Sequence, residues 1–286
     1  MRVCLGKLYI IIIISNVEYI NKNIIAWIKI KGGSKMNTLL EVKNLSKCYG
    51  EKRVVDKLNL KITEGEILGL IGPNGAGKST TIKMIIDVED KGEGEILFQN
   101  RLTKENLRQF KRSIGVVPQE IAVYEDISAY DNVRFFCSLY GHKGVDLKQR
   151  TREALEFVGL WEHRSELPSK FSGGMKRRLN IACSIAHTPK LLIMDEPTVG
   201  IDPQSRNHIM EAIRILKNRG TTVIYVSHYM EEIEAICNRI VILDHGTLLE
   251  DMEKEALKRK YSSKDCKTLE DIFLQLTGTE LRDGEE

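Results

Sequence analysis

The sequence lacks several features that mark particular classes of protein. No apolar run approaches the ~20 residues that a membrane-spanning helix needs, and Leu8–Ile14 is soon followed by polar residues. Aromatic residues make up 6% of the chain, and there are only six prolines. The six cysteines form no C-x-x-C pair, which excludes the common metal and redox motifs and favours small buried thiols in a reduced, cytosolic compartment.

The charge balance is also weak. A formal net charge of +3 over 286 residues argues against nucleic acid as the main partner. What the chain does contain is an ordinary globular mixture, 42% hydrophobic and 29% charged, with ample material for a buried core. No internal repeat is visible, so we expect one main domain rather than two similar domains in tandem.

Residues 1–35 differ from the rest of the chain. They are rich in Ile, Asn, Lys and Tyr, whose codons are A/T-rich, and a clean strand pattern begins directly after Met36. Lys31, Gly32 and Gly33 would be encoded by a purine-rich stretch suited to ribosome binding. No small-residue cleavage site of a signal peptide is evident. We therefore expect residues 1–35 to be a spurious or disordered extension, with translation starting at Met36; a short interfacial anchor is the alternative.

From residue 36 onward, strand patterns alternate with helix patterns. Such alternation predicts an α/β fold with a parallel sheet covered on both faces. A helical block at about 120–187 interrupts it and is expected to be an inserted subdomain. We expect strands at about 39–45, 54–62, 67–71, 95–98, 114–117, 191–194, 222–226 and 240–243, and helices at 78–86, 128–140, 146–158, after 174 and from 203 to about 220.

A phosphate-binding loop follows the strand at 67–71 and opens a helix. It consists of Gly72, Pro73, Asn74, Gly75, Ala76, Gly77, Lys78 and Ser79, which matches G-x-x-x-x-G-K-[ST] in full. Glycines let backbone N–H groups turn inward toward phosphate oxygens, and the helix N-terminus adds partial positive charge. We expect Lys78 to reach the β- and γ-phosphates, Ser79 to bind Mg²⁺ and Thr80 to support the phosphates.

A pair of acids ends the apolar strand at 191–194. In a parallel sheet, this carboxyl end lies beside the phosphate loop, where ligands of such sheets bind. We expect Asp195 to hold Mg²⁺ through water, and Glu196 to polarise the attacking water. Two acids that merely cap a strand on the surface are the alternative interpretation.

With these motifs in order, Met36–Gly246 resembles the ATP-binding cassette family. The resemblance implies a P-loop NTPase with a mostly parallel core sheet, an antiparallel β subdomain and an inserted helical subdomain. It also assigns roles to further positions. Tyr49 would be the platform on which adenine stacks, and Gln119 would be a mobile loop residue near Mg²⁺. Asp202 would contact the other subunit, and His228 would be the switch histidine. The signature that binds a partner's ATP would consist of Ser172, Gly173, Gly174 and Met175.

Two chains are needed in this arrangement, because phosphate loop and signature cannot close on one ATP within a single chain. The resemblance therefore implies a head-to-tail homodimer that binds two Mg-ATP and hydrolyses ATP. The segments 120–141, 171–180 and 269–278 resemble ATPases of bacterial two-component drug, peptide or ion exporters. This implies a separate membrane permease as partner and a peripheral position on the cytoplasmic face of the membrane.

Three further expectations complete the sequence interpretation. The cassette is expected to span 36–250, with a short C-terminal extension at 251–286. The aromatic residues of the helical block could form its core or a docking surface for the permease; they are Tyr124, Tyr130, Phe135, Phe136 and Tyr140. A soluble cassette ATPase acting in translation, DNA repair or cluster assembly is the competing function, and a cassette that only binds nucleotide is a third, disfavoured one.

Overall fold

The computed structural model describes residues 37–262 and 268–278, so the expected extension at 1–35 lies outside the described residues. Apolar strands in the middle and late parts of the chain form a six-stranded sheet. It is built from β3 (Ile67–Ile71), β6 (Ile114–Val117), β7 (Leu191–Asp195), β8 (Thr222–Val226), β9 (Arg239–Asp244) and β10 (Thr247–Glu253), in the order β10-β9-β3-β8-β7-β6. All neighbours pair in parallel except β9 and β10, which the turn at His245 and Gly246 joins as a hairpin.

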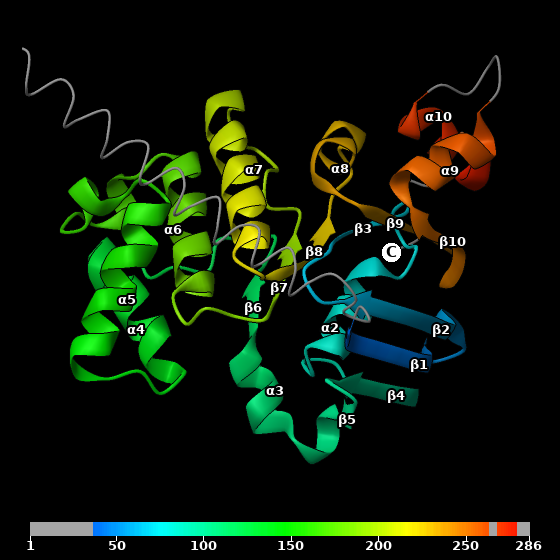
Figure 1. The fold of residues 1–286 in the computed structure, drawn as a ribbon, viewed down its shortest axis with the longest axis horizontal. Helices are drawn as coiled ribbons and strands as arrows, with labels where there is room; N and C mark the ends of the chain where they lie inside the picture. The colour runs from blue at the N-terminus through cyan, green and yellow to red at the C-terminus, as the bar shows by residue number, and fades with distance from the viewer. Residues whose placement is uncertain (1–36, 263–267, 279–286) are drawn as a thin grey trace, which may run out of the picture. The chain divides into compact units, whose positions relative to one another are not determined.

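A four-stranded antiparallel sheet uses the first part of the chain. Its strands are β1 (Thr38–Tyr49), β2 (Lys52–Thr63), β4 (Glu93–Phe98) and β5 (Arg101–Leu102), in the order β2-β1-β4-β5. The first two strands are longer than the sequence pattern predicts, because register shifts at bulges let their pairing continue to the turn after Tyr49. Figure 1 shows this sheet at the lower right, beside the main sheet.

Helix α2 (Lys78–Ile85) fills the space between the two sheets. Its apolar residues Ile82, Met84 and Ile85 share one core cluster with the inner faces of both sheets. Helix α3 (Leu107–Ser113) closes this cluster with Phe110, whose ring meets that of Phe98 edge-on at 5.2 Å. The loop that precedes α2 is thereby held on a rigid support.

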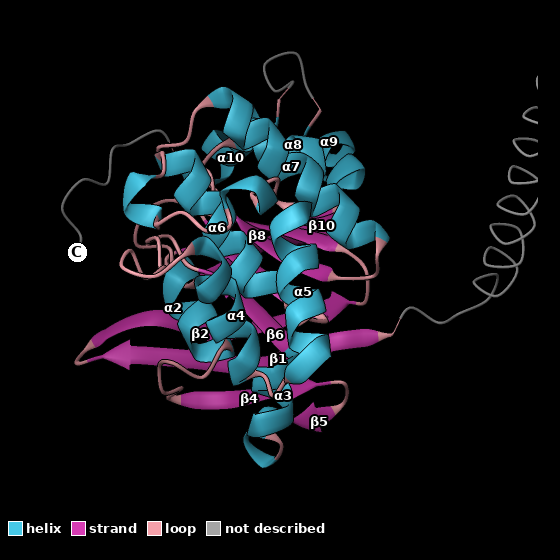
Figure 2. Cartoon of the chain, turned by 90° about the vertical axis from the view of Figure 1, so that its left-hand side faces the viewer, coloured by secondary structure: helices cyan, strands magenta, loops and turns pink. Residues whose placement is uncertain are grey.

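The helical block predicted near 120–187 contains α4 (Ala129–Leu139), α5 (Gly144–Phe157) and α6 (Gly173–Ile185). Figure 2 shows these helices in front of the sheet strands. Ser128 caps α4 by accepting a hydrogen bond from the N–H of Asp131 at 3.0 Å. Of the five aromatic candidates, Tyr124 and Phe135 are exposed, while Tyr130, Phe136 and Tyr140 are half-buried.

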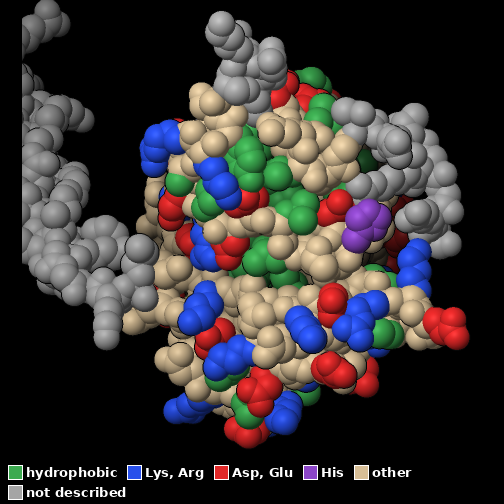
Figure 3. All heavy atoms as spheres, turned by 90° about the vertical axis from the view of Figure 1, so that its right-hand side faces the viewer, with side chains coloured by type: hydrophobic (Ala, Val, Ile, Leu, Met, Phe, Trp, Pro, Cys, Tyr) green, Lys and Arg blue, Asp and Glu red, His purple; other side chains and the backbone are tan. Residues whose placement is uncertain are grey.

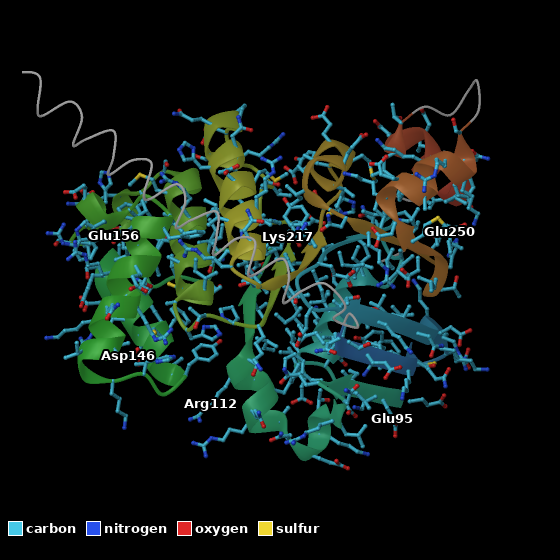
Figure 4. All side chains as sticks on the ribbon, viewed as in Figure 1. Glu95, Arg112, Asp146, Glu156, Lys217 and Glu250 are labelled. Carbon is cyan, nitrogen blue, oxygen red and sulfur yellow. The ribbon has the colours of Figure 1, made fainter. Side chains whose placement is uncertain are left out.

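The remaining helices are α7 (Pro203–Asn218), α8 (Met230–Ile236), α9 (Lys254–Tyr261) and α10 (Leu269–Thr277). The last two pack into the same core cluster as α4–α8, because Leu257, Leu269 and Ile272 are buried there. The carboxylate of Glu250 on β10 accepts hydrogen bonds from Lys260, at 2.5 Å, and from Tyr261 (Figure 4). The described helices α9 and α10 therefore pack into the core, within the segment that the sequence predicts to be a short C-terminal extension.

The surface shows no dominance of one charge on the face drawn in Figure 3, where Lys, Arg, Asp and Glu side chains are intermixed. Several salt bridges of the described residues are exposed on both partners, such as Arg152 with Glu156 at 2.7 Å, and pairs of this kind contribute little to stability. In the two described ranges, every helix is too short or too polar to cross a bilayer.

Candidate nucleotide-binding site

Four parallel strands bring the predicted site residues to one edge of the main sheet. Gly72 follows the end of β3, Gln119 follows β6, Asp195 ends β7 and His228 follows β8. Because these strands run the same way, their carboxyl ends meet at the same edge. Residues that lie far apart in the sequence thus converge at one place.

The phosphate loop is shaped by glycine. Gly75 and Gly77 have φ angles of 74° and 93°, a region that other residues rarely adopt. A Cβ on Gly77 would also lie 2.6 Å from the carbonyl oxygen of Val54. Helix α2 begins directly after Gly77 with no side-chain cap, so its first N–H groups are available to an anion.

Lys78 is the buried cation of this loop. Its Nζ donates hydrogen bonds to the carbonyl oxygens of Gly72, at 2.7 Å, and Pro73, at 2.9 Å. Burial lowers the pKa of Lys78 from 10.5 to about 8, while the charges of Glu196 and Asp195 oppose that shift. An incoming phosphate would further favour the charged ammonium. Ser79, next on the helix, is exposed and Thr80 is half-buried.

Glu196 lies at the centre of the catalytic candidates. One carboxylate oxygen lies 2.6 Å from Nε2 of His228, and the other accepts a hydrogen bond from the Gln119 amide at 3.0 Å. The backbone of Glu196 has a φ of 46°, in the left-handed region, and its N–H donates to the carbonyl oxygen of Val226 at 2.9 Å. The three residues predicted to be catalytic are therefore in mutual contact through one carboxylate.

The surroundings of Asp195 and His228 shift the pKa values of both groups. Burial, followed by the charge of Glu196, raises the pKa of Asp195, and Lys78 acts in the opposite direction. Burial and the nearby Lys78 cation lower the pKa of His228. At neutral pH, the histidine is thus favoured in its neutral form, which can both donate and accept a hydrogen bond.

Tyr49 lies at the end of β1 with 47% of its surface exposed. The Nζ of Lys47 lies 5.1 Å from the centre of its ring. One face of the ring therefore meets a cation, and the exposed remainder is suited to stacking with a flat ligand.

The signature turn opens helix α6. The Ser172 hydroxyl caps the helix by accepting from the N–H of Met175 at 3.2 Å, and a Cβ on Gly173 would meet nothing within 4 Å. A Cβ on Gly174 would lie 2.3 Å from the Ser205 hydroxyl and 3.1 Å from the Asp202 carboxylate. The Asp202 carboxylate caps α7 by accepting a hydrogen bond from the N–H of Ser205 at 2.9 Å.

Met175 packs against the hydrophobic core, so its side chain contributes to packing. Helix α6 and the phosphate loop lie apart in Figure 1, with β6 and β7 between them. The structure therefore unites the strand-end residues and leaves the signature turn open at a separate place.

Sequence patterns did not identify Arg177. It is buried on α6, and its guanidinium donates to the carbonyl oxygens of Pro118, at 2.7 Å, and Gln119, at 2.5 Å. It thereby fastens the Gln119 loop to the helix of the signature turn. The available signal was a charged residue among the otherwise apolar buried positions of a helix.

The family comparison agrees with this geometry. The family model described as "ABC transporter" matches residues 55–199. The linearmycin resistance ATP-binding protein LnrL of Bacillus subtilis is 48% identical over 211 residues, which cover 74% of this chain and 68% of that protein. The Nod factor export ATP-binding protein I of Cupriavidus metallidurans is 37% identical over 74% of this chain and 70% of its own length.

Among solved structures, a dimeric ATP-binding cassette in a post-hydrolysis state with ADP and Pi is similar to this chain. The TM-score is 0.67 and the identity 28%, over 75% of this chain and 98% of that one. The chain belongs to the ABC transporter family. Within that family it is an ATP-binding subunit that hydrolyses ATP.

Proposed function

We propose that two copies of this chain bind two Mg-ATP head to tail and power export through a separate membrane permease. One observation carries the proposal: the chain holds two anion-binding turns, at 72–79 and 172–174, that lie apart within one protomer. A two-fold dimer lets each protomer supply the turn that the other lacks at its nucleotide. The similar dimeric cassette supports this arrangement.

In this dimer, the strand-end residues would work on the protomer's own ATP. Lys78 and the N–H groups of 72–79 hold the phosphates, and Tyr49 stacks on the adenine. Glu196 orients and polarises the attacking water, while His228 and Gln119 hold Glu196 and contact the γ-phosphate. Ser172, Gly173 and Gly174 bind the γ-phosphate of the partner's ATP, and Asp202 contacts the partner.

The site also suits Mg²⁺ as the companion of ATP. Ser79 offers a hydroxyl, Asp195 a carboxylate and Gln119 an amide oxygen, which are the hard oxygen donors that this ion prefers. Among the described residues, no three His, Cys, Asp or Glu side chains form a cluster that could hold a metal. This donor set therefore suits an ion that arrives with phosphate and keeps water ligands. The bound ion would neutralise charge that develops on the phosphates.

A groove beside the Gln119 loop is the proposed docking site for the permease. It measures about 440 Å³, and its lining is mainly apolar, contributed by the end of α2, by β6 and by α4 and α6. Val88 on its rim is 72% exposed, and Phe136 lines its wall. A short amphipathic helix of the permease would fit such a groove, and docking there would hold the chain on the cytoplasmic face of the membrane.

The export assignment rests on relatives whose names refer to antibiotic resistance and Nod factor export. The alternative, a soluble cassette ATPase, makes a different prediction about partners. Tagged protein solubilised from membranes of its own host should co-purify with a protein of several membrane spans. If it stays in the soluble fraction without such a partner while hydrolysing ATP, the export proposal is wrong and the soluble alternative is favoured.

A pair of variants ties that experiment to the groove. Val88→Glu places a charge in the groove and should release the permease while the isolated chain keeps its ATPase activity. Val145→Glu is the matched control, because Val145 is 81% exposed on α5 and does not line the groove. Docking at this groove would be contradicted if both variants lost the co-purifying permease equally, or if both retained it.

A further inference from the structure

A buried carboxylate on α8 joins segments that belong to different parts of the site. Glu232 is only 3% exposed. One of its oxygens accepts hydrogen bonds from the hydroxyl groups of Thr198 at 2.8 Å, Tyr225 at 2.8 Å and Ser227 at 2.9 Å. The other oxygen lies 3.3 Å from Nε of Arg206. A buried carboxylate is costly, and this one meets a cation and three donors.

The partners of Glu232 adjoin the proposed catalytic residues. Thr198 lies two residues after Glu196, and Ser227 directly precedes His228. The Ser227 hydroxyl also accepts a hydrogen bond from the N–H of Tyr229 at 3.0 Å. Glu232 therefore fixes both chain segments from which the Glu196–His228 pair projects.

Arg206 extends the same network to the signature turn. It lies on the first turns of α7, directly after Ser205, against which Gly174 packs closely. Its guanidinium also lies over the ring of Tyr229 at 4.9 Å. Ser205 and Arg206 therefore form a continuous series of contacts from the signature turn to the carboxylate.

We propose that Glu232 is a positioning residue that couples the two ATP sites of the dimer. It connects the signature side of a protomer, which grips the partner's ATP, to the Glu196–His228 pair, which acts on the protomer's own ATP. This inference rests on the proposed head-to-tail dimer. It adds a route by which closure of one site aligns the catalytic pair of the other.

The chemistry of the network explains why a carboxylate is needed. A carboxylate only accepts hydrogen bonds, so one oxygen can serve three hydroxyl groups while the charge of the other faces the Arg206 guanidinium. An amide of the same size would direct its N–H₂ group at one set of donors and lose the ionic contact with Arg206. Glu232→Gln therefore weakens the connection while keeping the volume of the side chain.

The test is the ATP dependence of hydrolysis by the purified full chain. Wild type should form dimers with ATP and show a Hill coefficient above 1, approaching the two sites of the dimer. E232Q should show a Hill coefficient near 1 and a kcat lowered about tenfold, with unchanged affinity for a first ATP. Glu231→Gln, on the exposed neighbouring residue of the same helix, should match wild type.

A second experiment keeps the inference testable if E232Q does not fold. Arg206→Met and Ser227→Ala alter the two ends of the network and leave Glu232 in place. Their effects on the Hill coefficient and kcat should be non-multiplicative in the double variant, because both act through the same carboxylate. Multiplicative effects would overturn the proposed coupling.

The outcomes separate the two proposals. If wild type dimerises with ATP and is cooperative while E232Q behaves like E231Q, the coupling role is wrong and the proposed dimer stands. If wild type shows neither ATP-dependent dimers nor cooperativity, the proposed function fails, and the coupling of two sites fails with it.

Discussion

Two turns of this chain both direct backbone N–H groups toward an anion, but the side chains around them differ. The phosphate loop at 72–77 and the signature turn at 172–174 both place small residues before a helix N-terminus, where N–H groups favour an anion. The first is followed by a buried lysine and lies beside two carboxylates. The second has a serine hydroxyl and no acid of the catalytic pair, and Gly173 opens onto free space.

This difference indicates which turn would take part in hydrolysis and which would only bind phosphate. In the proposed function, the first turn would serve hydrolysis, because Lys78, Asp195 and Glu196 would supply charge where a phosphate bond breaks. The second would only bind phosphate, and it would do so when another molecule brings the phosphate to it. Gripping and hydrolysis should therefore be separable by substitution, and four experiments test this from the largest expected effect to the smallest.

Glu196→Gln should remove hydrolysis and leave both grips intact. The amide keeps the size of the side chain but cannot act as a base, so kcat should fall by a factor of about 10² or more. ATP binding and ATP-dependent dimers should persist, as measured by phosphate release and by size-exclusion chromatography with ATP. Glu95→Gln, an exposed position on β4 (Figure 4), is the control. A wild-type rate in E196Q would remove Glu196 from its proposed role.

Lys78 makes the first turn sensitive to pH in the absence of nucleotide. Its pKa is lowered from 10.5 to about 8 in the folded protein, so between these values the unfolded chain binds more protons. The free energy of unfolding should therefore rise with pH across this window, by about 3 kcal/mol in total. Urea unfolding at several pH values measures it.

The matched variants for this experiment are Lys78→Met and Lys104→Met, the second at an exposed turn residue. Lys78→Met should flatten the rise relative to wild type, whereas Lys104→Met should keep it. Parallel curves for wild type and Lys78→Met would contradict a burial-lowered pKa at Lys78.

The second turn contains its own matched pair of glycines. Gly173→Ala should leave the stability of the single chain unchanged or higher, because the added methyl group meets nothing within 4 Å. It should weaken ATP-dependent dimerisation at least tenfold, since the methyl group enters the space proposed for the partner's phosphate. Gly174→Ala should instead destabilise the fold by about 1–3 kcal/mol through its clash with Ser205.

Thermal melts without ATP and sedimentation with ATP distinguish the two glycine variants. Loss of stability in Gly173→Ala, or unimpaired dimers, would show that the second turn serves folding rather than a partner's nucleotide.

Tyr49 is expected to give the smallest effect, because its ring is half-exposed and supplies stacking alone. Tyr49→Ala should weaken ATP binding by roughly five- to tenfold, in the lower range for loss of base stacking, while Tyr49→Phe should retain affinity. Isothermal titration measures both. An unchanged affinity in the alanine variant would place the adenine elsewhere.

Much of this arrangement could be predicted from short-range sequence signals. The continuous apolar runs of β3, β7 and β8 identify buried parallel strands, and the motifs at 72–79, 195–196 and 228 follow directly from strand ends. Glu196, Gln119 and His228, which the sequence assigns to one site, contact each other in the structure. These features depend on local order along the chain.

Each of the two residues that were missed, Arg177 and Glu232, binds at least one partner far away in sequence. Arg177 donates hydrogen bonds to carbonyl oxygens some 58 residues earlier. Glu232 accepts hydrogen bonds from hydroxyl groups that follow the ends of two strands. Neither set of hydrogen-bond partners has a regular spacing along the sequence, so a sequence pattern does not identify it. Helix α8 is only seven residues long, too short for a clear helical period. The boundaries of β1 and β2 shifted for a related reason, because bulges and pairing decide where they stop.

The strand order of the main sheet also has a consequence for how the protein is made. Strand β3, which precedes the phosphate loop, pairs with β8 and β9. Ile67 is aligned with Val223 of β8, and Leu68 is aligned with Arg239 of β9. Both partners leave the ribosome long after β3 has emerged. The backbone N–H and C=O groups along both edges of the apolar strand β3 remain unpaired by these strands during most of translation. Nascent chains should therefore need protection from aggregation until β9 has been synthesised, and truncated products ending before it should be insoluble.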